Sequence, residues 1–223
     1  LRSSVPLHIK NGDGYAEFHL SPGEKAEFIL EDVQKHSIDQ SDPINFVELT
    51  LQQTFNYWTK WVAKSTYNGR WREMIIRSAL LLKLLISDPY GSVVAAPTFS
   101  LPEKIGGAKN WDYRFAWIRD AAFTIYSLMR IGYTDEATVF MQWMWSLAEN
   151  LQEHFILQPL YGIDGRTQLH EEELSHFEGY KQSYPVRIGN AAYKQLQLDI
   201  YGEFIDALYL YDKNVHPISH DTW

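Results

Sequence analysis

The sequence contains no cysteine, which excludes disulfide bonds, thiolate metal ligands and cysteine nucleophiles together. Long apolar runs are also missing. The densest one, residues 79–86, is interrupted by Lys83 and is far too short to span a bilayer. Basic residues are scarce, because 20 Lys and Arg stand against 28 Asp and Glu and leave a formal net charge of -8. This acidic balance argues against nucleic acid or an anionic membrane as a partner.

Motifs of several common catalytic and cofactor sites are absent as well. The sequence has neither a phosphate-binding glycine loop nor a G-x-S-x-G nucleophile motif. His170 and His176 do not have the spacing of the H-E-x-x-H zinc motif, and the acidic run at residues 171–173 is typical of a solvated face. We therefore expect no metal and no cofactor.

Aromatic residues, in contrast, are abundant. The chain has 8 Trp, 14 Tyr and 11 Phe, or 15% of all residues, within an apolar fraction of 45% that is typical of a packed protein. Large aromatic side chains either fill a core or stack against the apolar faces of sugar rings in a binding site. Composition alone favours the core and leaves the sugar site as an alternative.

Residues 5–30 alternate between apolar and polar side chains, as β-strands do. Three such runs, at 5–9, 16–20 and 26–30, are separated by turn signals at residues 11–14 and 21–24. This pattern predicts a three-stranded meander, which needs a partner to cover its apolar face. We expect residues 1–32 to be the end of a β-sandwich domain and residues 33–43 to be a linker.

The rest of the chain is predicted to be helical, which makes the fold mainly α. One helix is expected to begin at Pro43, with Asp42 as its N-cap. Four more are expected at about 70–87, 119–131, 134–150 and 191–211. The helix at 119–131 is apolar most of the way round and should be buried, whereas the helix at 134–150 has a polar outer face. This alternation suggests helical hairpins in inner and outer layers. The long connections at 88–118 and 151–189 are expected to carry function.

Residues 110–120 read N-W-D-Y-R-F-A-W-I-R-D and interleave charged with aromatic side chains directly before the apolar helix. Arg119 and Asp120 fall at the start of that helix, where exposed N–H groups favour a carboxylate. The pair either caps and braces the helix, or offers a guanidinium and a carboxylate to the vicinal hydroxyls of a sugar.

Several further segments occur in a characteristic order: G-R-W-R-E at 69–73, V-A-A-P-T-F-S-L-P-E at 94–103, then 110–120, and P-V-R-I-G-N at 185–190. In this combination the chain resembles the bacterial and archaeal glucoamylase- and trehalase-like enzymes of glycoside hydrolase family 15. The resemblance implies an N-terminal β-sandwich, a linking helix and an (α/α)6 barrel of six helical hairpins. Residues 44–223 would be the first, incomplete part of that barrel.

The resemblance also implies roles for individual residues. Arg119 and Asp120 would hold the hydroxyls of the terminal glucose, and Tyr113 and Trp117 would line the same dead-end pocket. Tyr184 and Arg187 correspond, across a gap, to a loop beside the next sugar. The inverting mechanism of the family needs an acid and a base carboxylate, both of which are expected beyond Trp223, so no catalytic residue is assigned to this chain.

The function predicted from the resemblance is an exo-acting, inverting α-glucoside hydrolase of glucoamylase type that acts on α-glucans or maltooligosaccharides. The alternatives are an α,α-trehalase, with trehalose as substrate, and a non-catalytic glucan-binding or regulatory domain. The first methionine is Met74 and no signal peptide precedes the body of the chain. We therefore expect a piece of a longer protein, inactive alone and self-associating through an exposed half-barrel surface. The resemblance, rather than the missing signal peptide, suggests a cytoplasmic location.

Overall fold

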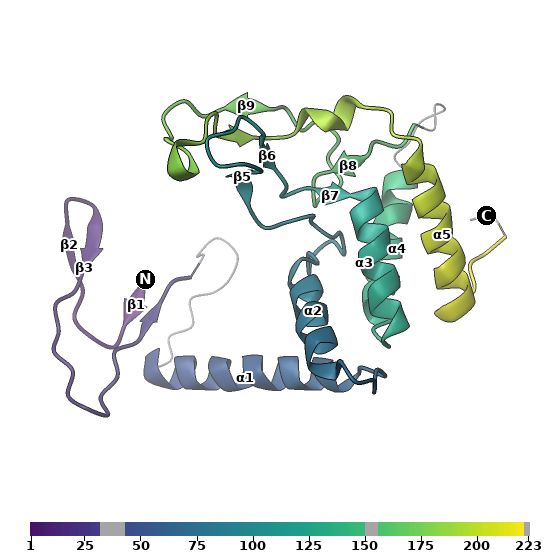
Figure 1. Ribbon diagram of the computed structural model, residues 1–223. Helices are drawn as coiled ribbons and strands as arrows, with labels where there is room; N and C mark the ends of the chain where they lie inside the picture. Colours follow the sequence, from purple (N-terminus) through teal and green to yellow (C-terminus); the bar gives the residue numbers. More distant parts are fainter. Residues whose placement is uncertain (32–42, 150–155, 221–223) are drawn as a thin grey trace. The chain divides into compact units, whose positions relative to one another are not determined.

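The computed structural model describes residues 1–31, 43–149 and 156–220. The chain divides into two compact units, Leu1–Ala63 and Lys64–Trp223, each of which is described by itself (Figure 1). Helices dominate, and the strands in the described ranges are short and paired antiparallel. The predicted mainly helical fold is confirmed at this level, whereas the six-hairpin barrel stays a prediction.

The first unit begins with four short strands, namely β1 (Arg2–Ser3), β2 (His8–Lys10), β3 (Asp13–Tyr15) and β4 (Phe28–Ile29). Strands β2 and β3 form a hairpin in which Lys10 lies opposite Asp13. Its two turn residues, Asn11 and Gly12, have φ angles of 55° and 88°, the positive values that a type I′ turn requires. The turn predicted at this point is therefore confirmed.

The predicted three-stranded meander is wrong. Residues 16–20 form no strand, and β4 pairs with β1 instead of with a neighbouring run. Alternation predicts which side chains share a face, but it does not say which strands pair. Phe18 and Leu20 remain 45% and 44% exposed, whereas Ile29 on β4 is buried. The assignment of residues 1–32 to a β-sandwich stays a prediction.

Helix α1 (Pro43–Ala63) completes the first unit and confirms the helix predicted after the Asp42-Pro43 pair. Asp42 and the predicted linker, apart from Pro43, lie outside the described residues. Leu51 and Phe55, which belong to the predicted apolar stripe of this helix, are 68% and 66% exposed. The helical period is thus correct, but it does not correspond to a buried face along the whole helix.

The second unit contains α2 (Arg72–Leu84), α3 (Ile118–Arg130), α4 (Asp135–Glu149) and α5 (Asp199–Asn214). The first three match their predicted ranges closely. The fifth predicted helix is different, because residues 191–194 form a separate short 3-10 helix, η2, that the side chain of Asn190 caps. Gln195 then adopts extended backbone, so α5 begins only at Asp199. None of the described helices is long and apolar enough to cross a membrane.

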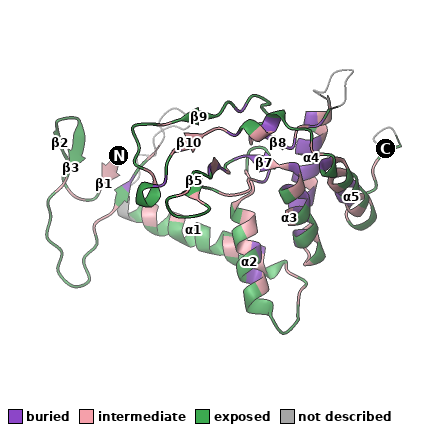
Figure 2. Cartoon of the chain, turned by 45° about the horizontal axis from the view of Figure 1, so that its top comes forward, coloured by how far each residue is buried: buried purple, intermediate pink, exposed green. Residues whose placement is uncertain are grey.

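Helix α3 packs against α4 and α5 through one face, and the buried colouring in Figure 2 follows that face. Ile118, Ile125 and Leu128 are almost completely buried, whereas Phe123 and Tyr126 are 55% and 40% exposed. The prediction that α3 is buried therefore holds for one face only, because α4 and α5 do not enclose the helix. The buried residues of the main core come mostly from these three helices: Ile118, Ala121, Ile125, Ala137, Phe140, Met141, Trp143, Met144, Leu147, Ile200, Leu208 and Tyr211.

The two long connections contain short strand pairs rather than irregular loops. The first connection supplies β5 (Phe99–Pro102), β6 (Asn110–Asp112) and β7 (Ala116–Trp117); the second supplies β8 (Leu160–Tyr161), β9 (Glu172–Glu173) and β10 (Arg187–Ile188). The pairs are β5 with β6, β7 with β8 and β9 with β10. Since β7 runs directly into α3, these strands lie at the end of the helices where α3 begins (Figure 1).

The hydroxyl of Ser100 is one of several groups that join the two connections. The Ser100 Oγ accepts a hydrogen bond from the Arg187 N–H at 2.5 Å and donates one to the Arg187 carbonyl at 2.6 Å. Ser100 is buried and has a φ of 55°. The two segments predicted to carry function therefore meet in space, and they surround the site described next.

Candidate functional site

Strand β6 and the residue after it present two different faces. Asn110 and Asp112 are completely buried, whereas Trp111 and Tyr113 are half-buried and line a cavity. Successive side chains of a strand point to opposite sides, so the N-W-D-Y sequence places its polar residues on one side and its aromatic residues on the other.

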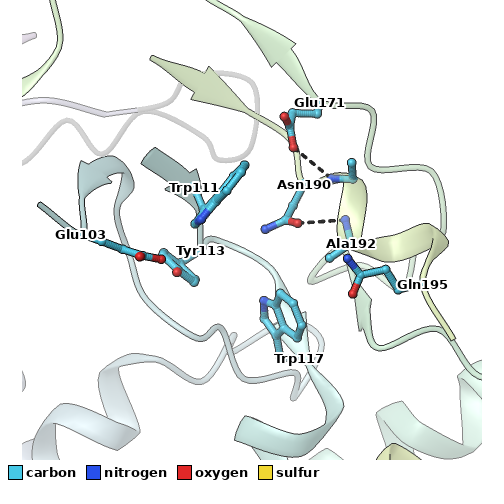
Figure 3. Close-up of a pocket in the computed structure, with 9 residues that line it drawn as sticks. Glu103, Trp111, Tyr113, Trp117, Glu171, Asn190, Ala192 and Gln195 are labelled. Atoms are coloured by element: carbon cyan, nitrogen blue, oxygen red, sulfur yellow. Dashed lines mark hydrogen bonds between the residues drawn. The ribbon is translucent and has the colours of Figure 1, made fainter. Parts of the chain in front are cut away.

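The cavity has a volume of about 460 Å³, within the range of about 300–1,000 Å³ that is typical of small-molecule sites. Figure 3 shows Trp111 and Tyr113 on one side, Asn190 and Ala192 on the other, and Trp117 below them. The lining residues are Glu103, Trp111, Tyr113, Trp117, Glu171, Asn190, Ala191, Ala192 and Gln195. Three aromatic rings and several hydrogen-bonding groups thus surround one space, which is a suitable environment for a polar ligand with apolar faces.

The wall opposite the aromatic residues is held by hydrogen bonds to the main chain of η2 (Figure 3). The Asn190 Oδ1 accepts from the Ala192 N–H at 3.1 Å, and the Glu171 Oε2 accepts from the Ala191 N–H at 3.2 Å. These bonds use two of the N–H groups that the start of a helix leaves free. The position of this wall is therefore determined before any ligand binds.

Trp117 is the last residue before α3, and its indole ring lines the cavity. The Nε1 atom of this ring is buried and finds no hydrogen-bond acceptor in the described part of the chain. A buried N–H without a partner destabilises a protein by about 1–3 kcal/mol.

Tyr113 is the phenol of the site. Burial raises its pKa above the usual value, and the negative charges of Glu103 and Asp120 raise it further. The hydroxyl is therefore neutral at physiological pH and can donate a hydrogen bond to a ligand.

Arg119 and Asp120 begin α3 as predicted, but neither lines the cavity. The Arg119 Nη1 donates to the Asp199 Oδ2 at 2.5 Å and to the Gln197 Oε1 at 3.2 Å, and its guanidinium lies 5.9 Å from the centre of the Trp117 ring. This pairing lowers the pKa of Asp199. Asp120 lies in the first turn of α3 and is exposed. Its negative charge contributes to the raised pKa of Tyr113.

Tyr184 and Arg187 also lie outside the lining of the cavity. Tyr184 is 54% exposed and precedes Pro185 through a cis peptide bond. The Arg187 guanidinium lies 5.1 Å from the centre of the Trp111 ring, donates to the Ala108 carbonyl at 2.8 Å and pairs with Glu173 at 3.1 Å. Arg187 thus supports the aromatic wall from behind, and its predicted contact with a sugar stays a prediction.

Several lining residues were not selected from the sequence. Trp111 was recoverable, because the alternation of the strand puts it on the same face as Tyr113. Glu103, Glu171, Asn190 and Gln195 come from three other segments, and no local spacing connects them with residues 110–120. Only the folded chain brings them together.

The acidic run at residues 171–173 is part of this architecture. Glu171 and Glu173 both pair with Arg187, at 3.3 Å and 3.1 Å. Within the described ranges, no group of three or more His, Asp or Glu side chains is arranged to hold a metal ion.

Comparisons with known proteins agree with the sequence motifs. The family model of glycosyl hydrolases family 15 matches residues 69–223. A protein named trehalase from Thermoplasma volcanium is 48% identical over 78% of this chain and 27% of its own length. A trehalase from Thermoplasma acidophilum is 45% identical over 78% of this chain and 29% of its own length.

A third relative, a trehalase from Mycolicibacterium smegmatis, is 37% identical over 100% of this chain. The chain covers 33% of that relative, so it spans about a third or less of the length of these proteins. No solved structure was found to match. The family model and the identity to these relatives show that the chain belongs to family 15 of the glycosyl hydrolases.

Proposed function

We propose that these residues form the glucose-binding part of an α,α-trehalase. The aromatic-walled cavity in front of α3 supports sugar binding, and membership of family 15 supports glycoside hydrolysis. Relatives at 37–48% identity carry the name trehalase. They favour the trehalase alternative over the glucoamylase-type activity that the sequence first suggested, so trehalose replaces α-glucan and maltooligosaccharide as the proposed substrate.

The chemistry of the site accounts for binding and orientation. The rings of Trp111 and Trp117 offer planar faces to the apolar faces of a pyranose. Neutral Tyr113 and the unpartnered indole N–H of Trp117 donate to sugar oxygens, while Asp120 accepts from sugar hydroxyls. A fixed arrangement of these groups lowers the entropic cost of reaching a reactive geometry.

The two carboxylic groups that an inverting hydrolase needs are not assigned to this chain. Glu103 and Glu171 line the cavity, but Glu171 pairs with Arg187 at 3.3 Å and Glu103 lies 3.7 Å from Lys109. We regard both as wall residues, and we assign the acid and the base to segments that the longer relatives possess.

Substrate choice tests the proposal directly. A polypeptide of the relatives' length that carries these residues should release glucose from trehalose with a kcat/KM at least about tenfold above that for maltose. The measurement compares initial rates on trehalose, maltose and soluble starch at equal enzyme concentration. Faster release from maltose or starch would restore the glucoamylase-type reading. The 223-residue chain alone should bind trehalose without turnover, and multiple turnovers by that chain would contradict the division of roles.

Replacing Trp117 with phenylalanine tests the unpartnered donor. Phenylalanine keeps an aromatic face but lacks the N–H, so we expect trehalose affinity to fall about tenfold, which corresponds to one hydrogen bond of about 1.4 kcal/mol. The affinity can be measured by calorimetric titration. Trp145→Phe is the control, because Trp145 packs on Tyr211 in the helical core and also has a buried indole N–H without an acceptor in the described ranges. Equal losses in both variants would exclude a specific role for Trp117.

A further inference from the structure

The cavity is built from two segments that lie far apart in the sequence, and Asp112 connects them. One segment carries Trp111 and Tyr113, the neighbours of Asp112; the other is the Asn190–Ala192 wall. The Asp112 Oδ2 accepts a hydrogen bond from the Gly189 N–H at 3.0 Å, and the Asp112 carbonyl accepts one from the Asn190 Nδ2 at 3.0 Å. Asp112 thus holds the start of the opposite wall through two hydrogen bonds.

The carboxylate of Asp112 has no capacity left for a ligand. Its side chain is 0% exposed. Besides the Gly189 bond, Oδ1 accepts from the main-chain N–H of Arg114 at 3.1 Å and from its Nε at 2.9 Å, and Oδ2 accepts from its Nη2 at 2.8 Å. A buried charge that is paired and fully hydrogen-bonded is held in one geometry. Since Asp112 lies on the face of β6 away from the cavity, it acts only through its neighbours.

Gly189 makes the connection possible. Its φ is +74°, and a Cβ atom at this position would lie against the carbonyl oxygen of His170. Glycine is therefore required where the second segment turns toward Asp112. Asn110, on the same face of β6 as Asp112, adds hydrogen bonds to the carbonyls of Ser183 at 3.2 Å and Pro185 at 3.1 Å. The buried face of β6 thus holds the whole segment from 183 to 190.

We propose that Asp112 is a positioning residue that sets the distance between the two walls of the cavity and thereby the affinity for glucose. This inference rests on the proposed function. On this proposal, Asn110 and Asp112 hold the two walls at a fixed distance, and Trp111 and Tyr113 contact the sugar. The buried carboxylate exerts its effect in the free protein and in the complex alike, so it changes binding of substrate and transition state together.

The test is Asp112→Asn in a polypeptide of the relatives' length, with trehalose as substrate. The amide keeps the size of the side chain but places an NH2 group against the N–H donors of Arg114 and Gly189. We expect KM to rise about tenfold while kcat changes less than about threefold. The value of kcat is normalised to the folded fraction, which circular dichroism measures. A loss of thermal stability with an unchanged KM would overturn the proposal.

Asp164→Asn is the matched control. Asp164 and Arg166 repeat the Asp-x-Arg arrangement, with the Arg166 main-chain N–H 3.3 Å from Oδ1 and the guanidinium 3.1 Å from Oδ2, but this pair is exposed and local. Its KM should equal that of the unmodified protein, and a matching rise in both variants would also overturn the proposal. If Asp112→Asn fails to fold, Arg114→Gln is tested instead, because the Arg114 side chain is 44% exposed and binds the same carboxylate. An unchanged KM in Arg114→Gln would then overturn the proposal.

The substrate panel separates this inference from the proposed function. If the unmodified protein prefers maltose to trehalose, the proposed substrate is wrong, and the Asp112 comparison is made with maltose. If the unmodified protein neither cleaves nor binds either sugar, both proposals are wrong.

Discussion

Replacing Asp120 with alanine is expected to lower kcat/KM for trehalose about 10²–10⁴-fold, because the two hydrogen bonds that we propose from sugar hydroxyls to its carboxylate would contribute about 1.5–3 kcal/mol each. Asp120 lies in the first turn of α3 and is exposed, and its negative charge contributes to the raised pKa of Tyr113. Steady-state kinetics on trehalose measure the effect.

Asp135→Ala controls for the helix itself. Asp135 lies in the first turn of α4 and has a side chain that is 74% exposed, so its loss removes the same favourable interaction with a helix N-terminus. That interaction contributes about 0.3–1 kcal/mol to stability. We expect Asp135→Ala to keep kcat/KM within about threefold of the unmodified protein. An Asp120→Ala variant that remains equally active would show that Asp120 only begins the helix.

Replacing Lys83 with methionine is expected to lower the free energy of unfolding by about 1.5–3 kcal/mol, the contribution of a hydrogen bond between charged groups. The Lys83 Nζ pairs with the Glu136 Oε1 at 3.0 Å and joins α2 to α4, and the two side chains are only 19% and 4% exposed. The substitution removes this cation and leaves a carboxylate in a site with little access to water. Urea unfolding followed by circular dichroism gives the change.

Lys64→Met is the control, because Lys64 also pairs with an acidic residue in the first turn of α4. Lys64 pairs with Asp135 at 2.7 Å, but the two side chains are 51% and 74% exposed. An exposed pair of this kind contributes about 0–1 kcal/mol. The double variant Lys83→Met, Glu136→Gln should regain part of the lost stability, since the charge is then absent as well. Equal effects of Lys83→Met and Lys64→Met would contradict the assigned difference in burial.

The helices illustrate what periodicity can predict. The range of α3 followed from the apolar content of residues 119–131 and from Gly132, whose φ of 98° ends the helix. The burial of α3 did not follow, because Phe123 and Tyr126 are exposed on the side that α4 and α5 leave open. Periodicity reports which residues share a face, whereas burial depends on the elements that cover it.

The candidate site shows the same division. Tyr113 and Trp117, which the resemblance assigns to a glucose pocket, line the cavity, and their contact with a sugar stays a prediction. Arg187 lies over the Trp111 ring and pairs with two glutamates, and its contact with a sugar stays a prediction as well. A motif identifies a residue type and its approximate place, but the direction of its side chain depends on neighbours contributed by distant segments.

The sequence by itself determined the helical character of the chain, the hairpin turn at Asn11-Gly12, the order of the family 15 motifs and two aromatic residues of the cavity. These features depend on local propensities and on residue identity. Only the tertiary structure decided that β4 pairs with β1, that Glu171 and residues 190–192 form the opposite wall and that Asp112 joins that wall to β6. The physical reason is that hydrogen bonds between residues far apart in the sequence leave no periodic trace in it.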